Sequence, residues 1–283
     1  MKSPNTKRAT SGPVATVMVG NTTTPVVLWS NTRRVKRRFA WPTNLAEKEL
    51  AKHAKPIAFK ETVVLAGVVP QVVAKFARQL SISQSHIANR KSKITLRFRK
   101  GLRCPLTIRP RPASEVGDDR LAAALGALAI DPRCPWVVVD AGTALTVNAV
   151  KPALSGRGGK VVGVFEGGLI VPGEGLSLRA LGQAAQLPVL TPPKTNRVLP
   201  VVGLSTKQAI QFGVRHAQTA VVVELVRAQA KVLGPKTRVV LTGGGADALW
   251  PAVRRALKSL RPLRDSDLVH RGLLTCSKAS RSG

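Results

Sequence analysis

Two short stretches of the sequence combine carboxylates with side chains suited to phosphate chemistry. In the first, Asp140 ends an apolar run and is followed by Gly142, Thr143 and Thr146. Glycine lets main-chain N–H groups approach phosphate oxygens, threonine adds a hydroxyl donor, and a carboxylate can hold a cation that offsets the phosphate charge. The stretch is therefore a candidate phosphate and cation site, although an ordinary hairpin turn has the same composition.

The second stretch is Gly117-Asp118-Asp119-Arg120. A carboxylate beside an arginine can act as a general base while the arginine orients the substrate or offsets charge. The alternative is that both acids only stabilise the first turn of a helix through its dipole. The residues alone leave both interpretations open.

Two glycine-rich turns have the composition of nucleotide-binding loops. One is the Gly20-Asn21-Thr22 turn between two strand-like runs, and the other is Thr242-Gly243-Gly244-Gly245 between a strand-like run and a helix. Each of these turns is a weak signal by itself.

Apolar periodicity predicts the elements that position these turns. Strands are expected at 14–19, 26–29, 63–69, 94–98, 137–139, 161–165 and 239–241. Helices are expected at 45–55, 72–80, 114–131 with Ser114 as N-cap, 176–186 and 205–232, and another from about 246. The basic run 33–38 is interpreted as solvated surface or a docking patch, and 167–173 as a rigid loop.

Composition limits the class of protein. The chain has 283 residues, 44% of them hydrophobic, which suffices for one large core or two modest ones. No apolar run is long enough to span a membrane, and the N-terminus lacks the apolar segment of a secretory signal. The cysteines, Cys104, Cys134 and Cys276, form neither a metal-ligand pattern nor a closed disulfide set. We therefore expect a cytoplasmic protein.

The charge is large and uneven. The net charge is +31, and residues 1–111 hold 23 Lys and Arg against 3 acids. Such a field attracts anions and can bind nucleic acid non-specifically. Aromatic residues make up only 4% of the chain and tyrosine is absent, which argues against recognition of single strands by base stacking.

Taken together, the motifs resemble those of the type III pantothenate kinases, members of the actin-like, sugar-kinase superfamily. The family's G-x-D-R motif is intact at Gly117–Arg120, and its Gly-Gly-x-Ile-x-Pro-Gly motif is intact at Gly167–Gly173. Its D-x-G-T-A-x-T-x-D motif runs from Asp140 to Asn148 and lacks only the last acid. Its D-x-G-N-T motif stands at Met18–Thr22, and Thr242–Gly244 matches its last nucleotide loop. The order and spacing are kept over roughly residues 14–274.

The resemblance implies an α/β fold of two similar actin-like (ribonuclease H-like) domains, with mixed sheets flanked by helices and a cleft between them. On this basis the N-terminal domain is placed at 14–131 and the C-terminal domain at 132–275. Disordered segments are expected at 1–13 and 276–283. The family resemblance also implies a homodimer, with pantothenate and ATP as substrates.

The resemblance assigns roles residue by residue. Asp119 would be the catalytic base that takes the proton from the primary hydroxyl of pantothenate. Asp140 would hold a monovalent cation, K⁺ or NH₄⁺, and Mg²⁺ would arrive with ATP. The substrate-binding residues would be Gly117, Asp118, Asp119, Arg120 and Thr206, and the ATP-binding residues Gly20, Asn21, Thr22, Thr23, Thr24, Pro25 and Thr143.

Two departures from the family pattern keep a second interpretation open. Met18 replaces an acid, and a thioether is a poor ligand for Mg²⁺. Asn148 replaces another acid, which keeps an oxygen but removes its charge. The alternative is a catalytically weakened relative whose basic first domain binds nucleic acid or an acidic protein as a regulator.

Overall fold

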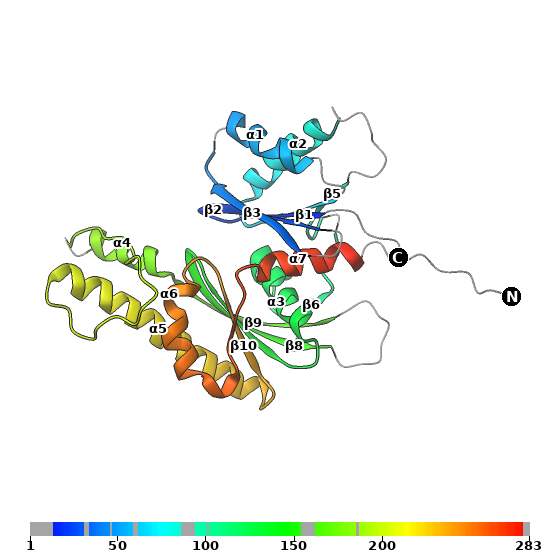
Figure 1. Ribbon diagram of the computed structural model, residues 1–283. Helices are drawn as coiled ribbons and strands as arrows, with labels where there is room; N and C mark the ends of the chain where they lie inside the picture. Colours follow the sequence, from blue (N-terminus) through cyan, green and yellow to red (C-terminus); the bar gives the residue numbers. More distant parts are fainter. Residues whose placement is uncertain are drawn as a thin grey trace. The chain divides into compact units, whose positions relative to one another are not determined.

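The computed structural model describes residues 14–30, 34–45, 47–58, 62–85, 94–100, 102–153, 162–184 and 187–279. The chain divides into two compact units, Met1–Leu102 and Arg103–Gly283 (Figure 1). Each unit contains one β-sheet with helices packed on it. None of the helices in the described ranges is long and apolar enough to cross a membrane.

The first unit is built on a five-stranded sheet in the order β3-β2-β1-β4-β5. Its strands are β1 (Val14–Val19), β2 (Thr23–Trp29), β3 (Val35–Pro42), β4 (Thr62–Gly67) and β5 (Ile94–Arg97). β2 is antiparallel to both β1 and β3, whereas β1, β4 and β5 run parallel to one another. The hairpin predicted around Gly20 is therefore confirmed as β1–β2.

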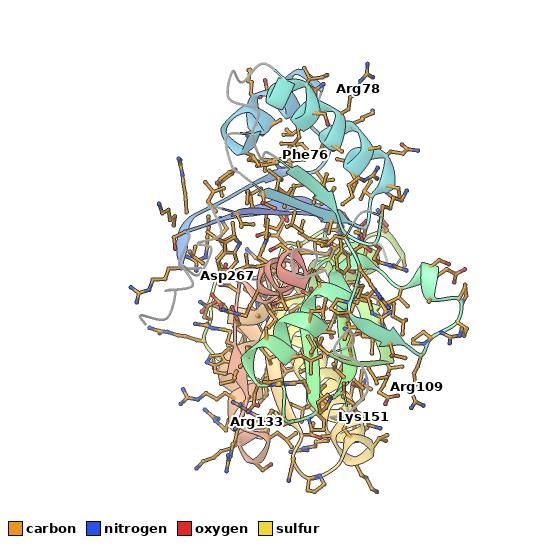
Figure 2. All side chains as sticks on the ribbon, turned by 90° about the vertical axis from the view of Figure 1, so that its right-hand side faces the viewer. Phe76, Arg78, Arg109, Arg133, Lys151 and Asp267 are labelled. Atoms are coloured by element: carbon orange, nitrogen blue, oxygen red, sulfur yellow. The ribbon has the colours of Figure 1, made fainter. Side chains whose placement is uncertain are left out.

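Helices α1 (Glu47–Ala58) and α2 (Pro70–Ser85) provide the apolar layer on this sheet. Phe76 and Leu80 of α2 share a buried cluster with Val17 of β1 and Ile57 of α1. Figure 2 shows Phe76 pointing toward the sheet and Arg78, two positions on, pointing away from it. This alternation is that of an amphipathic helix lying on a sheet.

The second unit has a six-stranded sheet in the order β11-β10-β7-β8-β9-β6. Its strands are β6 (Leu106–Ile108), β7 (Trp136–Ala141), β8 (Ala144–Pro152), β9 (Gly163–Pro172), β10 (Arg238–Thr242) and β11 (Leu263–Arg264). From β9 to β11 the order and the strand directions repeat those of the first sheet, with β8 as the antiparallel strand and β6 added at the edge. The predicted fold class, two mixed sheets flanked by helices, is confirmed.

Helices cover both faces of the second sheet (Figure 1). α5 (Thr206–Leu233) and α6 (Ala246–Ala256) share an apolar cluster with the sheet residues Val137, Val139 and Leu241. α3 (Asp118–Ile130) and α7 (Leu268–Ala279) lie on the other face, and α4 (Glu174–Ala184) packs beside α5. Gly126 of α3 and Gly272 of α7 let these two helices approach closely, because a side chain at either position would overlap the opposite backbone.

Several sequence-based expectations are wrong. The expected loop 167–173 belongs mostly to β9, where its backbone pairs with β8, so non-local pairing overrides the glycine and proline content. Ser114 lies in a short 3₁₀ turn (Ala113–Glu115), and the N-cap of α3 is Gly117. Within the tail expected to be disordered, residues 276–279 continue α7, and Cys276 is buried. The strands β3, β6, β8 and β11 and the helix α7 were not predicted.

Two further expectations concern the ends of the chain and the domain boundary. Residues 1–13 and 280–283 lie outside the described residues. The predicted domain boundary after residue 131 differs from the division after Leu102, because α3 packs against α7 and the second sheet.

Candidate active site

The N-terminal end of α3 holds the Gly117–Arg120 motif. Gly117 is the N-cap, and Asp118 and Asp119 occupy the first turn, where the helix dipole favours negative charge. One carboxylate oxygen of Asp119 (Oδ1) accepts a 2.7 Å hydrogen bond from the backbone N–H of Arg120. Burial raises the pKa of Asp119, whereas this hydrogen bond and the charge of Arg120 oppose the rise. A carboxylate with a raised pKa is the better proton acceptor, which suits a general base.

The guanidinium of Arg120 is held in place by the sheet below it. Its Nε donates to Oδ1 of Asn148 at 2.8 Å, and the group lies over the ring of Phe165 at 5.3 Å. The Nδ2 of Asn148 donates in turn to the hydroxyl of Thr146 at 2.9 Å. No residue of the described ranges accepts a hydrogen bond from the two terminal nitrogens of Arg120, so these remain available to an anionic or polar substrate.

Asp140 stands at the end of β7, where the chain turns through Gly142 and Thr143 into β8. Its pKa is raised from 3.8 to about 7, mainly by burial and secondly by the negative charge of Asp119. Asp140 is paired in register with Thr146 of β8, whose hydroxyl accepts the hydrogen bond from Asn148, the partner of Arg120. Across the part of the chain that is described, no cationic side chain or hydrogen-bond donor is paired with Asp140.

Three glycines bring other backbone segments against this turn. The N–H of Gly173 donates to the carbonyl of Thr143 at 3.0 Å, and the N–H of Gly245 donates to that of Ala141 at 2.8 Å. A side chain at Gly173 would overlap the carbonyls of Gly142 and Thr143, and one at Gly243 would overlap the Asp140 carboxylate. The exposed residues Gly142 and Thr143 therefore sit on a closely packed base.

A monovalent cation fits the residues around Asp140. Among the described residues the carboxylate has no positive partner, and a point beside Gly142 is within 4 Å of both its Oδ1 and the carbonyl oxygen of Ala144. A single carboxylate could hold such an ion, with carbonyl oxygens of the turn as further ligands.

In the first unit, the predicted ATP loop forms the turn between β1 and β2. The N–H of Gly20 donates to the carbonyl of Thr23 at 3.1 Å, and Asn21, Thr22 and Thr23 are exposed. Thr24 is buried and shares a 3.0 Å hydrogen bond with the hydroxyl of Thr43, which also donates to the carbonyl of Gly20. Pro25 continues β2.

Two residues that matter for these turns were not among the predicted site residues. Thr43 braces the first turn from a position 23 residues beyond Gly20, and no local pattern marks it. Gly173 supports the Thr143 turn, and its place in the G-G-x-I-x-P-G motif was the available signal.

The structure does not bring Thr206 to Asp119. Thr206 is exposed at the first position of α5, after the N-cap Ser205. Gln218 of the same helix contacts the backbone of Pro172, at the end of β9. Thr206 lies twelve residues before Gln218, or about 18 Å at 1.5 Å per helical residue. Figure 1 shows this end of α5 beside α4, away from α3.

Comparison with known proteins agrees with the resemblance of the sequence motifs. The family model for type III pantothenate kinase matches residues 16–228. The chain belongs to the type III pantothenate kinases. The relative from Caulobacter vibrioides is 33% identical over 76% of this chain and 74% of its own. The relative from Hyphomonas neptunium is 31% identical over 93% and 98%, respectively.

Among solved structures, MreB 5 of Spiroplasma citri bound to AMPPNP aligns with a TM-score of 0.49 at 10% identity, covering 99% of this chain and 98% of that one. Compared with the family motifs, this type III pantothenate kinase departs at Met18 and Asn148. Met18 is 4% exposed at the end of β1, and Asn148 is fully buried as the partner of Arg120.

Proposed function

We propose that the protein transfers the γ-phosphoryl group of MgATP to the primary hydroxyl of pantothenate, forming 4'-phosphopantothenate in the first step of coenzyme A synthesis. One chain of contacts carries this proposal: Arg120, next to Asp119, donates to Asn148, Asn148 donates to Thr146, and Thr146 is the register partner of Asp140 in the β7–β8 pair. A candidate base and a candidate cation ligand, each in its family motif, thus belong to one site.

In this proposal Asp119 accepts the proton of the pantothenate hydroxyl as the oxygen attacks phosphorus. Arg120 binds the substrate through its terminal nitrogens while Asn148 fixes its orientation. Gly117 and Asp118 complete the proposed binding site for pantothenate. Phosphoryl transfer depends mainly on alignment and on offsetting charge around the phosphates, so positioning supplies most of the acceleration.

The nucleotide is assigned to two turns. Thr143 donates its hydroxyl to a phosphate oxygen, and the exposed turn Gly20–Thr23, with Thr24 and Pro25 behind it, forms the other ATP loop. Asp140 and neighbouring carbonyls hold the monovalent cation, K⁺ or NH₄⁺. When bound, this cation supplies positive charge beside the phosphates.

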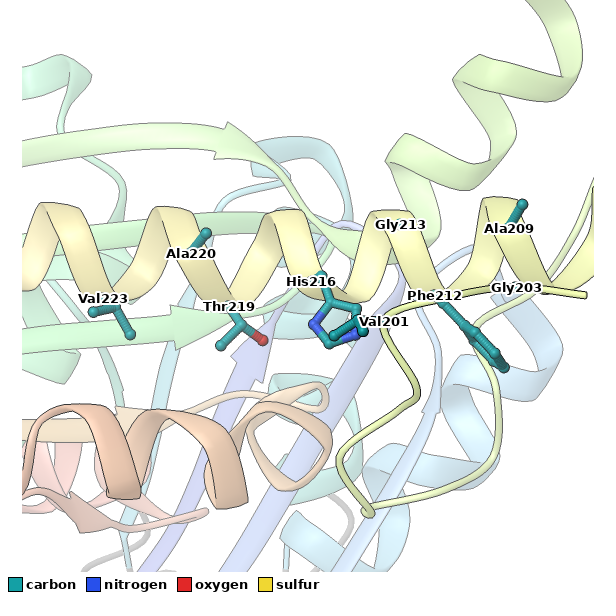
Figure 3. A pocket seen from close by; sticks show the side chains of 9 residues that line it. All are labelled: Val201, Gly203, Ala209, Phe212, Gly213, His216, Thr219, Ala220 and Val223. Atoms are coloured by element: carbon teal, nitrogen blue, oxygen red, sulfur yellow. The ribbon is translucent and has the colours of Figure 1, made fainter.

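A homodimer supplies the missing substrate contact. Because Thr206 is far from Asp119 along α5, we assign it to the active site of a second protomer. Apolar surface near Thr206 supports this assignment, since Val201 and Leu204 are 86% and 89% exposed. A pocket of about 660 Å³ lies beside them, and Figure 3 shows Phe212, His216 and Thr219 pointing to one side of α5 next to Val201. Apolar surface of this kind is typical of an interaction site, which here supports an interface between protomers.

Subunit mixing tests the dimer. In a two-fold dimer with shared sites, combining the Asp119→Asn and Thr206→Ala proteins regenerates one intact site per heterodimer. Activity should therefore reappear on mixing two inactive variants. No recovery, with heterodimers demonstrated by mass, would place Thr206 outside the shared site.

The activity itself is tested by coupling ADP release to a spectroscopic assay, with and without pantothenate and potassium. ADP release that depends on pantothenate and is stimulated by K⁺ is expected. ATP hydrolysis that ignores pantothenate would contradict the proposal. A cytoplasmic location is proposed as well, because three widely spaced cysteines form no closed disulfide set.

A further inference from the structure

Two buried side chains of α5 bind the residues on either side of Gly173, one through its backbone and one through its side chain. The Nε2 of Gln218 donates to the carbonyl of Pro172 at 2.9 Å, and the Nε of Arg215 donates to Oε1 of Glu174 at 2.8 Å. Arg215 and Gln218 are three residues apart and therefore lie on one face of the helix. Gly173 is thus fixed from both of its neighbours by a single element.

Gly173 passes this constraint to the Thr143 turn. Its N–H donates to the carbonyl of Thr143, and its α-carbon is so close to the carbonyls of Gly142 and Thr143 that no side chain fits between them. A shift of Gly173 would therefore displace Thr143 or break the hydrogen bond.

Arg215 also reaches the other segment that supports the turn. Its side chain is 4% exposed and donates to the carbonyls of Thr195, Pro193 and Ala248 at 3.2, 3.3 and 3.5 Å. Ala248 is in the first turn of α6, which follows Gly245, whose N–H donates to the carbonyl of Ala141. One guanidinium thus connects α4, α5 and α6 behind the two segments that pack on residues 141–143.

A buried ion pair is weak evidence for a role in stability, because desolvation offsets much of its attraction. Here the hydrogen bonds of Arg215 converge on the segments that support the Thr143 turn, so the main effect of the pair is to position these segments. We propose that Arg215 and Gln218 are positioning residues that set the location of Thr143, so that α5 controls the affinity of the site for ATP. This inference rests on the proposed role of Thr143 in binding ATP phosphate.

Gln218→Met tests the proposal, because methionine has a similar shape and removes the bond to Pro172. Gln211→Met is the matched control: Gln211 lies on the same helix and donates an equivalent 2.8 Å bond to the carbonyl of Thr191, which is not next to Gly173. We expect Gln218→Met to raise KM for ATP about tenfold and Gln211→Met to leave it unchanged. Arg215→Lys should lower kcat/KM for ATP by about 10²-fold, the size expected for a misplacement of roughly 1 Å.

Pantothenate affinity and melting temperature separate positioning from general destabilisation. Calorimetry should give the same Kd for pantothenate in the wild-type, Gln218→Met and Gln211→Met proteins. Equal losses of ATP and pantothenate affinity, or equal effects of the two methionine variants, would overturn the proposal. If Arg215→Lys does not fold, the comparison of the two methionine variants still decides it. A wild-type protein without pantothenate-dependent turnover would instead contradict the proposed function.

Discussion

The backbone of Gly243 lies against the carboxylate of Asp140. Gly243 has a φ of +90°, a conformation that residues with a side chain rarely adopt, and a Cβ at this position would overlap Oδ1 of Asp140. The glycine-rich segment after β10 is therefore fitted to the carboxylate that ends β7. The two strands are parallel neighbours, with Thr242 directly opposite Asp140.

Gly243→Ala should consequently displace Asp140 and weaken the dependence of activity on potassium. We expect the K⁺ concentration for half-maximal rate to rise about tenfold or more. The loss of thermal stability should be small beside this effect. Gly244→Ala is the matched control, because a Cβ there meets nothing within 4 Å and its φ is not positive. Equal responses of the two variants in potassium titrations would show that the contact with Asp140 is unimportant.

Asp119→Asn tests the catalytic base. A base acts on the transition state, so kcat should fall by about 10²–10⁴-fold while ATP still binds. Asp118→Asn should have a mild effect, since the family motif leaves that position free. Steady-state kinetics and nucleotide titration of both variants provide the comparison. Losses of the same size at both positions would remove the assignment.

How much of the site could be predicted from the sequence depends on how far apart along the chain the contacting residues are. Gly117–Arg120 and Asp140–Thr143 are short segments that their motifs marked as candidates. The predicted boundary after residue 131 put them in different domains, whereas the structure has both in the second unit. The partner of Arg120, Asn148, is 28 residues away, so its role as a hydrogen-bond acceptor was not predicted. Residues 167–172 were misassigned for the same reason, because only pairing with β8 makes them a strand.

The same argument applies to Thr206. The family resemblance indicated a substrate contact, but a resemblance in sequence carries no information on which protomer provides it. The length of α5 and the contact of Gln218 with Pro172 put Thr206 about 18 Å along the helix from that contact, and this separation is the reason for proposing a second protomer.

The pKa of Asp140 predicts a linked effect of pH and potassium on stability. The folded-state pKa of about 7 exceeds the ordinary value of 3.8, so the folded protein keeps a proton that the unfolded chain releases between these values. The free energy of unfolding contributed by Asp140 therefore falls as pH rises from about 4 to about 7. A cation beside the ionised carboxylate offsets this loss.

Potassium chloride should accordingly raise Tm more near pH ~8 than near pH ~5, relative to tetramethylammonium chloride at equal ionic strength. Each 1 kcal/mol gained corresponds to roughly 2–4 °C for a chain of this size. Asp140→Asn should abolish the difference between the salts. A variant that still responds to potassium would place the cation elsewhere.

The basic residues of β3 predict weak binding of nucleic acid. Lys36, Arg37 and Arg38 are exposed on an edge strand, where charge also discourages pairing with other chains. We expect sequence-indifferent binding of duplex DNA that weakens linearly in log–log form with salt and does not compete with pantothenate. Replacing the three residues with glutamine should reduce the magnitude of the salt slope by about 2–3. Tight, sequence-selective binding near physiological salt would favour a regulatory role.

Met18→Asp tests the sharpest departure from the family pattern. Met18 is 4% exposed on the central strand β1, opposite Ala66 of β4. An aspartate there would bury a carboxylate at a position now filled by an apolar side chain, at a cost of roughly 3–5 kcal/mol when uncompensated. We expect Tm to fall by about 10 °C, with no decrease in the Mg²⁺ concentration needed for half-maximal rate. Met18→Leu, which conserves volume, should cost less than about 1.5 kcal/mol. A stable Met18→Asp protein that needs less Mg²⁺ would show instead that the end of β1 still accepts a metal-anchoring acid, and that methionine has weakened the first ATP loop without repacking it.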